Sequence, residues 1–453
     1  MRDQILVPFQ GPGEGVEQLA WGQKGLWQTI QREGASVYMS GLTPLPAGTS
    51  VELVADMIGF LFGRHQALRT RLRPESDGSI RQVVSASGVT TLDVVDAGDQ
   101  DPGEVGNAIM DEYQATDFDY PNEWPLRAAV IRSNGELTHM AAVYLHTALD
   151  AFGLQVLLAD LANYGSATAS EPVQALHPMD QARWQQTPAA QRQCDASLKH
   201  LERVLRTAPA QRFPGPVVEG EPTFPTLVLR SPATRLAVRM IAHRKAMDTS
   251  QILLGLYGIA VARQTGIDPF VTMLAVSNRF RPGLANSVSA VAQISPCLIE
   301  LADITVDEAI GRARRAAVSA YKNAYYDPPQ RMALIDRVTS ELGEPVDLSC
   351  FFSDRRTERD QESAEVTVEQ VLAALAETEH YFDPAAERVF EKLYLSVDND
   401  EDAVILRMSA NSTYLPPDLM VELARNIEAA AVEAATAPDT PTRVRPAPAA
   451  VLA

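Results

Sequence analysis

Hydrophobic residues recur every three or four positions in several stretches of the chain, which is the spacing that places them on one face of an α-helix. The clearest example begins at Val51 and ends near Gly63. A second example follows Asp150, whose short acidic side chain suits the cap position at the start of a helix. Further helices are predicted near residues 102–117, 235–245, 249–265 and 418–435.

Other stretches are short and rich in β-branched residues, which is typical of strands. Two of them, Arg127–Arg132 and Leu137–Leu145, are separated by the dipeptide Asn134-Gly135, which predicts a tight hairpin turn. A second hairpin is predicted around the acidic residues 398–402. We interpret these residues as a solvated turn, because an EF-hand calcium loop would need a glycine and a distant glutamate. The predicted strands cover 80–84, 90–95, 127–132, 137–145, 270–276, 392–397 and 403–408.

Helical and strand patterns alternate along both halves of the chain, which favours an α/β fold. The chain has 453 residues, 46% of them hydrophobic, and this is enough to bury two cores rather than one. Prolines punctuate a polar helical stretch near the middle, which we interpret as a connector between the halves. The predicted division is a flexible leader over 1–16, an N-terminal subdomain over 17–175, a connector over 176–225, a C-terminal subdomain over 226–436 and a disordered tail over 437–453.

The formal net charge of −19 disfavours nucleic acid and anionic membranes as partners, because both bind clustered lysine and arginine. The three cysteines, Cys194, Cys297 and Cys350, are widely spaced and lack the C-x-x-C pairing of redox and zinc sites. We expect them to be reduced and buried. The N-terminal residues do not resemble a signal peptide, and no apolar run is long enough for a membrane helix, so the sequence predicts a cytoplasmic protein.

Several enzyme classes are excluded by their motifs. The sequence lacks the serine-hydrolase elbow, the Walker phosphate loop and the H-E-x-x-H zinc helix, and the glycines within residues 11–15 do not fit a dinucleotide loop. We therefore predict no metal site. What remains is the turn at residues 144–151, where His146 leaves a hydrophobic strand and Asp150 follows four positions later. Taken alone, this pair is also compatible with a buried structural histidine.

Short motifs follow one another along most of the chain, from near residue 17 to about residue 430. The most specific is Arg64–Leu72, which reads R-H-Q-A-L-R-T-R-L, and residues 145–151 read L-H-x-x-x-D-A. These segments resemble two motifs of the condensation-domain superfamily of nonribosomal peptide synthetases, the second of which is H-H-x-x-x-D-G in that family. The other segments that resemble the family are Gln23–Trp27, Phe118-Asp119, Pro125–Arg127, Ser277–Arg279 and Tyr326–Pro329.

The resemblance implies two chloramphenicol-acetyltransferase-like α/β subdomains, arranged in a V with the active site in a central tunnel. Family members join a thioester, carried on the phosphopantetheine arm of an acyl or peptidyl carrier protein, to an amine or alcohol acceptor. The chain is therefore expected to be an acyltransferase that makes an amide or ester bond. It should bind no cofactor of its own and act as a monomer. Carrier proteins are acidic, so docking needs a basic patch. Arg312, Arg314 and Arg315 are candidates, although a solvated helix face is the favoured interpretation of this cluster.

The resemblance also implies roles for individual residues. His146 matches the second motif histidine, and a neutral imidazole can accept a proton from the attacking group or orient that group. Asp150 matches the motif aspartate, whose role in the family is chiefly structural. We predict that Asp150 pairs with Arg279, because a guanidinium suits a buried carboxylate and this pair would join the two halves.

Four positions depart from the family pattern. Leu145 replaces the first motif histidine and Ala151 the motif glycine, while Ser289 and Gln293 occupy a region where a glycine and an asparagine are usual. We expect all four to line the substrate tunnel, where a methyl group at position 151 would narrow it. The heterocyclising members, which have an aspartate in place of Leu145, and the epimerising members, which need both histidines, are excluded.

These departures from the family pattern are also compatible with a second hypothesis. A catalytically silent module of the same fold would recruit a tailoring enzyme or a carrier protein instead of forming a bond. A structural scaffold without a carrier is less favoured, because it gives no reason to retain both His146 and Asp150.

Overall fold

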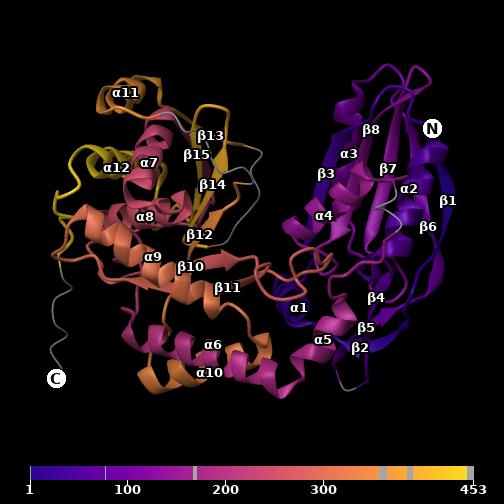
Figure 1. Cartoon of the computed structure of the whole chain (residues 1–453), viewed down its shortest axis with the longest axis horizontal. Helices are drawn as coiled ribbons and strands as arrows, with labels where there is room; N and C mark the ends of the chain where they lie inside the picture. The colour runs from indigo at the N-terminus through magenta and orange to yellow at the C-terminus, as the bar shows by residue number, and fades with distance from the viewer. Residues whose placement is uncertain (1, 77, 167–170, 357–364, 385–390, 446–453) are drawn as a thin grey trace. The chain divides into compact units, whose positions relative to one another are not determined.

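The described chain forms two compact units (Figure 1). Unit 1 contains Met1–Asp195 together with Ser277–Gln293 and Tyr325–Pro329, and unit 2 contains the rest of the chain. Two segments from the second half of the sequence therefore belong to the unit that the first half builds. The computed structural model describes residues 2–76, 78–166, 171–356, 365–384 and 391–445.

A mixed five-stranded sheet forms the centre of unit 1, in the order β1-β6-β7-β8-β3. β6 and β7 are parallel and are connected through α3 (Pro102–Gln114), whereas the other neighbouring pairs are antiparallel. The predicted hairpin is confirmed as β7 and β8, whose turn residues Asn134 and Gly135 have left-handed φ values of 51° and 84°. The strands are β1 (Arg2–Gln10), β3 (Tyr38–Pro44), β6 (Ser87–Asp96), β7 (Leu126–Ser133) and β8 (Glu136–Leu145).

Side chains of β7 and β8 alternate between two hydrophobic cores, one on each face of this sheet. Val130 and Tyr144 belong to the core that includes the apolar face of α2 (Val51–Arg64), as the helical spacing there predicts. Leu145 belongs to the other core, which includes residues of α1 (Trp21–Glu33) and α3. Because both faces are covered, these two strands are largely apolar instead of alternating with polar residues.

Smaller elements complete unit 1. A three-stranded antiparallel sheet has the order β2-β5-β4, and α4 follows the central strand β8 directly. α6 begins in unit 1 and continues into unit 2. These elements are β2 (Gly15–Gln18), η1 (Gln66–Arg69), β4 (Thr70–Pro74), β5 (Ile80–Val84), α4 (Ala151–Ala162), α5 (Pro178–Gln185) and α6 (Pro188–Thr207).

Unit 2 is built on a seven-stranded mixed sheet in the order β11-β10-β12-β14-β15-β9-β13. The second predicted hairpin is confirmed as β14 and β15, and α8 is buried on nearly all sides, which accounts for its almost uniformly apolar sequence. The strands are β9 (Thr226–Ser231), β10 (Phe270–Val276), β11 (Gln293–Ile299), β12 (Cys350–Asp354), β13 (Glu379–Phe382), β14 (Leu393–Asn399) and β15 (Val404–Ala410). The helices are α7 (Pro232–Lys245), α8 (Thr249–Thr265), α9 (Val306–Lys322), α10 (Pro328–Leu342), α11 (Val368–Ala373), η3 (Ala374–Glu377) and α12 (Pro417–Thr436).

The predicted flexible leader over 1–16 is wrong. β1 pairs with β6 along its whole length, and its side chains Val7 and Phe9 are buried in the core of unit 1. The glycines that follow β1 suggested a flexible segment, whereas the strand is held by β6, whose paired residues lie 77 to 93 positions away and are not revealed by local sequence.

The predicted connector and tail are also corrected. Within 176–225, α5 belongs to unit 1 and α6 spans the boundary between the units, so the helical part of this stretch is not a separate connector. The prolines between positions 209 and 225 lie in the irregular segment between α6 and β9. Within the predicted tail 437–453, Pro441 bridges to Thr305 and Val444 is buried. Residues 446–453 of the predicted tail lie outside the described residues.

The expectations from composition can be compared with the structure. All three cysteines are buried and none forms a disulfide, as predicted. In the acidic turn, Asp400 and Asp402 both pair with the Arg230 side chain, with 2.8 Å between Asp400 Oδ2 and Arg230 Nε. No helix within the described ranges is long and apolar enough to cross a lipid bilayer.

Candidate active site

The turn between β8 and α4 holds His146 at the end of a central strand. Leu145 is the last residue of β8, and the next backbone N–H, that of His146, donates to the Val37 carbonyl at 2.9 Å. The Ala148 N–H donates back to the Leu145 carbonyl at 2.9 Å, which closes the turn. Asp150 then caps α4, as predicted, since its Oδ1 accepts from the Gly153 N–H at 2.8 Å.

The His146 ring is fixed in one tautomer by its own turn. Its Nδ1 lies 2.9 Å from the Leu149 carbonyl oxygen, and a carbonyl can only accept, so Nδ1 carries the proton. In the neutral ring Nε2 therefore has a free lone pair, and Nε2 makes no hydrogen bond to any described residue. The side chain is half-buried, so Nε2 of this histidine can act as a proton acceptor.

The Asp150 carboxylate is fully engaged in structural contacts. Besides capping α4, Oδ1 accepts from Arg279 Nη2 at 2.5 Å, while Oδ2 accepts from the N–H groups of Val291 and Ala292 at 2.9 and 3.0 Å. The two side chains of the ion pair are 5% and 9% exposed. The predicted pairing of Asp150 with Arg279 is present, and it leaves this carboxylate no free position for proton transfer.

Arg279 organises the loop that follows β10. Its guanidinium donates to the carbonyls of Leu284 at 3.1 Å, of Ser287, and of Ser289 at 3.1 Å. This loop lies within Ser277–Gln293 and so belongs to unit 1, as does Asp150. The pair was expected to join the two predicted subdomains, with Arg279 in the C-terminal one. This expectation is wrong, because both residues belong to unit 1, and the pair attaches a loop from the second half of the sequence to that unit.

Two glycines let this loop lie directly against the helices of unit 1. A Cβ at Gly22 of α1 would come within 2.0 Å of the Ala290 carbonyl oxygen, which is a severe clash. A Cβ at Gly153 of α4 would lie 3.4 Å from the backbone of Ser289. Glycine at position 22 is therefore required by the close approach of the backbone.

Ser289, which is predicted to line the tunnel, lies in a buried polar network. Its side chain is 1% exposed, and its Oγ lies 2.8 Å from both Gln181 Nε2 and Ser287 Oγ. Ser287 Oγ donates to the Leu176 carbonyl at 2.6 Å. Gln181 was not predicted as part of the site, because a lone glutamine on a polar helix is usually exposed. Its side chain is identified by its burial, at 1% exposure.

Gln293 also makes structural contacts. Its side-chain Nε2 donates to the Tyr326 carbonyl at 2.9 Å and its Oε1 accepts from the Tyr326 N–H at 3.2 Å. The neighbouring Tyr325 hydroxyl accepts from Gln185 Nε2 at 2.7 Å, and Lys24 Nζ pairs with Asp327 at 3.0 Å. The aromatic-proline motif is therefore attached to α1, α5 and the loop after β10, all within unit 1.

The remaining two predicted tunnel positions differ from each other. Leu145 is 3% exposed and packs in a hydrophobic core, so its side chain contributes to stability. Ala151 is the exposed first residue of α4 and is absent from the positions with left-handed backbone, so alanine fits there without strain. Whether any of the four positions contacts substrate stays a prediction. Among the residues that the structure describes, no three His, Cys, Asp or Glu side chains are grouped so as to hold a metal ion.

Comparison with known proteins agrees with this geometry. Residues 14–379 match the family model of the condensation domain. The chain is 28% identical over 337 residues to cyclosporin synthetase simA of Tolypocladium inflatum, an alignment that covers 70% of this chain and 2% of that synthetase. The chain thus spans only a small part of the length of this curated relative.

Solved structures share the fold at low identity. A condensation domain from the enacyloxin polyketide synthase, studied for chain release, has a TM-score of 0.70 at 17% identity, covering 98% of this chain and 86% of that one. The X-domain in its complex with OxyB from teicoplanin biosynthesis has a TM-score of 0.68 at 17% identity, covering 96% of each chain. The predicted two-subdomain α/β fold is confirmed, while the V arrangement and the tunnel stay predictions.

Proposed function

Because this chain belongs to the condensation-domain family, we propose that it is an acyltransferase that forms an amide or ester bond from a thioester on a carrier protein. The observation that carries the proposal is the fixed tautomer of His146. Its Nδ1–H is bound to the Leu149 carbonyl, which leaves Nε2 as the proton acceptor.

In the proposed reaction the acceptor nitrogen or oxygen attacks the thioester carbonyl carbon. A C–N or C–O bond forms, the C–S bond breaks, and the phosphopantetheine thiolate of the carrier leaves. His146 Nε2 orients the attacking group and takes the proton that it loses, and this proton then passes to the departing thiolate. Asp150 and Arg279 hold the turn and the loop in place and take no part in proton transfer.

The carrier protein and the acceptor are the proposed partners. The phosphopantetheine arm belongs to the carrier, so this chain supplies side chains and backbone only. No residue of the site requires a metal or a nucleotide for the step written above.

The proposal can be tested by measuring products by intact-mass spectrometry, with a panel of carrier-bound acyl thioesters and candidate amine and alcohol acceptors. His146→Gln should lower turnover by about 10²- to 10⁴-fold, which is the usual contribution of a positioned base. Thermal stability should change little, because the ring is half-buried and makes one side-chain hydrogen bond.

A matched control is available on the same strand. His139 of β8 is also half-buried, and its Nδ1 contacts only the neighbouring Thr138 hydroxyl. His139→Gln should retain wild-type turnover. Equal turnover by the wild type and His146→Gln would remove His146 from the mechanism.

The second candidate function is a silent module that recruits a tailoring enzyme or a carrier. Burial of Leu145 in a core, where the family motif has a histidine, favours it, and so does the fold shared with an X-domain solved in complex with OxyB. This reading predicts carrier binding without product from any donor and acceptor pair. Binding that is unchanged in His146→Gln, with no turnover by either protein, would favour recruitment over catalysis.

A further inference from the structure

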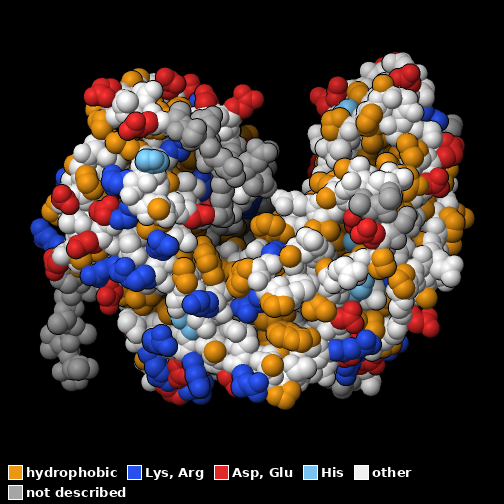
Figure 2. Space-filling model, viewed as in Figure 1, with side chains coloured by type: hydrophobic (Ala, Val, Ile, Leu, Met, Phe, Trp, Pro, Cys, Tyr) orange, Lys and Arg blue, Asp and Glu red, His pale blue; other side chains and the backbone are white. Residues whose placement is uncertain are grey.

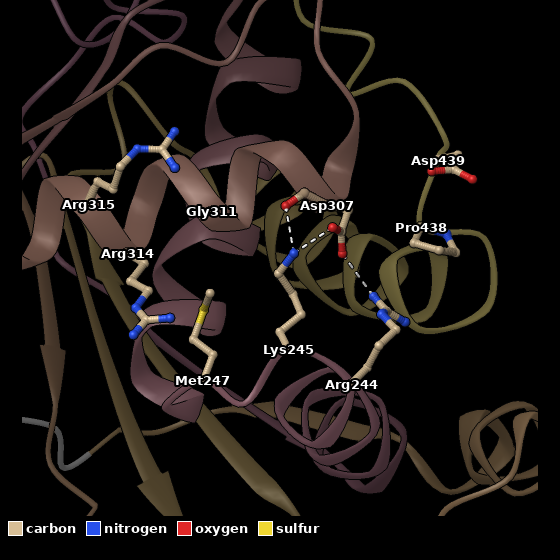
Figure 3. A pocket seen from close by; sticks show the side chains of 9 residues that line it. All are labelled: Arg244, Lys245, Met247, Asp307, Gly311, Arg314, Arg315, Pro438 and Asp439. Atoms are coloured by element: carbon tan, nitrogen blue, oxygen red, sulfur yellow. Dashed lines mark hydrogen bonds and ion pairs between the residues drawn. The ribbon is translucent and has the colours of Figure 1, made fainter.

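A pocket of about 660 Å³ lies in unit 2, apart from the residues of the candidate active site (Figure 3). It is formed by the C-terminal end of α7, one face of α9 and the chain after α12. Figure 2 shows lysine and arginine side chains gathered over the region of α9. The lining residues are Arg244, Lys245, Met247, Asp307, Gly311, Arg314, Arg315, Pro438 and Asp439.

The pocket is basic in a chain whose net charge is −19. Its four cationic side chains face only two carboxylates, and one of these, Asp307, is shared by Arg244 at 3.1 Å and Lys245 at 2.5 Å (Figure 3). Arg314 and Arg315 are exposed and make no ion pair or hydrogen bond to any described residue. Two guanidinium groups are therefore available to an incoming anion.

Backbone groups at the start of α9 do not supply this site. The N–H groups of Val306 and Asp307 donate to the carbonyls of Thr440 and Pro438 at 2.9 and 3.2 Å, and a capping box satisfies the next amide. An anion in the pocket must therefore be held by side chains. Arg312, the third arginine of the cluster noted in the sequence, pairs with Glu300 and does not line the pocket.

We infer that this pocket binds a small molecule carrying two or more phosphoryl groups. Guanidinium groups bind phosphate oxygens in bidentate fashion, and cations from α7 and α9 can each engage a different phosphoryl group. The volume exceeds that of a single phosphate ion and falls in the range of small-molecule sites. The inference does not depend on acyl transfer, since every lining residue belongs to unit 2.

The test is calorimetric titration of the intact chain with pyrophosphate, ADP and orthophosphate, each at ionic strength matched with sodium chloride. Pyrophosphate and ADP should bind saturably, and orthophosphate at least about tenfold more weakly, because it cannot reach both groups of cations. Orthophosphate binding as tight as that of pyrophosphate would overturn the requirement for two phosphoryl groups. Absence of saturable binding by all three would overturn the site.

Variants that remove positive charge test which residues bind pyrophosphate. Arg314→Gln with Arg315→Gln should weaken pyrophosphate binding at least about tenfold, since charge-assisted hydrogen bonds are lost. Lys199→Gln with Arg203→Gln removes two exposed cations from α6 in the same unit and should leave binding unchanged. An equal loss of pyrophosphate binding in both double variants would show that pyrophosphate is attracted by surface cations in general. This result would overturn the proposed site.

A steric variant separates pocket binding from docking of an acidic surface. A Cβ at Gly311 would meet only Arg315 Nη1, at 3.7 Å, and Gly311 lines the pocket, so Gly311→Leu should occupy the pocket without changing its charge. This variant should remain folded and lose pyrophosphate binding. Undiminished binding in folded Gly311→Leu would show that the pocket is not the site.

Discussion

The carboxylate of Asp150 and the guanidinium of Arg279 meet at 2.5 Å within unit 1, although the two residues are 129 positions apart in the sequence. Asp150 fixes the start of α4 next to His146, and Arg279 fixes the loop after β10. One ion pair thus orders both chain segments that surround the candidate catalytic turn.

Breaking this pair should destabilise unit 1 strongly. Asp150→Ala leaves the Arg279 charge buried and unpaired, so the free energy of unfolding should fall by about 3–5 kcal/mol. Chemical denaturation followed by tryptophan fluorescence measures this loss. The double variant Asp150→Ala with Arg279→Met should lose less than the sum of the two single variants, because neither charge is then left alone.

A surface pair provides the control for that prediction. Arg132 and Asp96 are 2.6 Å apart but 33% and 41% exposed, so Asp96→Asn should leave the denaturation midpoint close to that of the wild type. A similar loss from both sites would show that burial does not set the strength of the Asp150–Arg279 pair.

Gly22 and Gly25 of α1 should respond to alanine in opposite directions. Alanine usually stabilises a helix interior by about 0.5–1 kcal/mol relative to glycine. Gly25→Ala should show this gain, because its Cβ would meet only Pro328 at 3.6 Å. Gly22→Ala should destabilise the protein, because its Cβ would lie 2.0 Å from the Ala290 carbonyl oxygen. Thermal unfolding of both variants measures the difference, and a gain in Gly22→Ala would refute the close loop contact.

Restoring the family histidine at position 145 should improve neither the stability nor the turnover of the protein. Leu145→His replaces a core side chain with a polar ring, and burying this ring should cost about 2–4 kcal/mol of the free energy of unfolding. Turnover in the mass-spectrometric assay should not rise. Leu145→Met keeps the volume and polarity and should cost less than about 1.5 kcal/mol. A more active Leu145→His variant would show that the missing histidine limits catalysis.

Acid should destabilise the protein partly through His177. The pKa of His177 is lowered from 6.5 to about 4, chiefly by burial; the nearby His65 and Arg69 contribute to this lowering, while Asp180 opposes it. Between these values the unfolded chain binds a proton that the folded chain does not. The free energy of unfolding therefore falls as the pH drops from 6.5 towards 4, and is unaffected by this group at higher pH.

The size of this effect can be isolated by substitution. One such group contributes a slope of at most about 1.4 kcal/mol per pH unit, and partial solvent exposure reduces it. Denaturation of His177→Gln at several pH values between 4 and 7 should show a shallower pH dependence than the wild type. His243→Gln, which changes an exposed histidine of α7, should keep the wild-type slope.

The sequence pattern predicted the helices and strands that are determined by neighbouring residues. The helix α2 has one apolar face, and the β7–β8 hairpin has Asn134-Gly135 at its turn, so both could be read from a few neighbouring residues. His146 and the ion pair between Asp150 and Arg279 were identified from motif spacing and the family resemblance.

What the sequence did not reveal depends on distant contacts. β1 precedes a glycine-rich segment, and its pairing with the distant β6 holds it as a strand. Gln181 and Ser289 meet at 2.8 Å across 108 positions, so neither residue type signals a buried network by itself. The amide of Gln293 bonds the backbone of Tyr326, 33 positions away, and local sequence does not reveal this contact either.

The assignment of Ser277–Gln293 and Tyr325–Pro329 to unit 1 has a consequence for the order in which the protein can be made. A ribosome that has completed residue 195 has produced every strand of the unit 1 sheets, yet Asp150 still lacks Arg279 and α1 still lacks the loop that lies on Gly22. Domains generally fold as they emerge during synthesis. Here the first unit to begin folding cannot be completed until Pro329 has been added, well after the strands β9, β10 and β11 of the second unit exist.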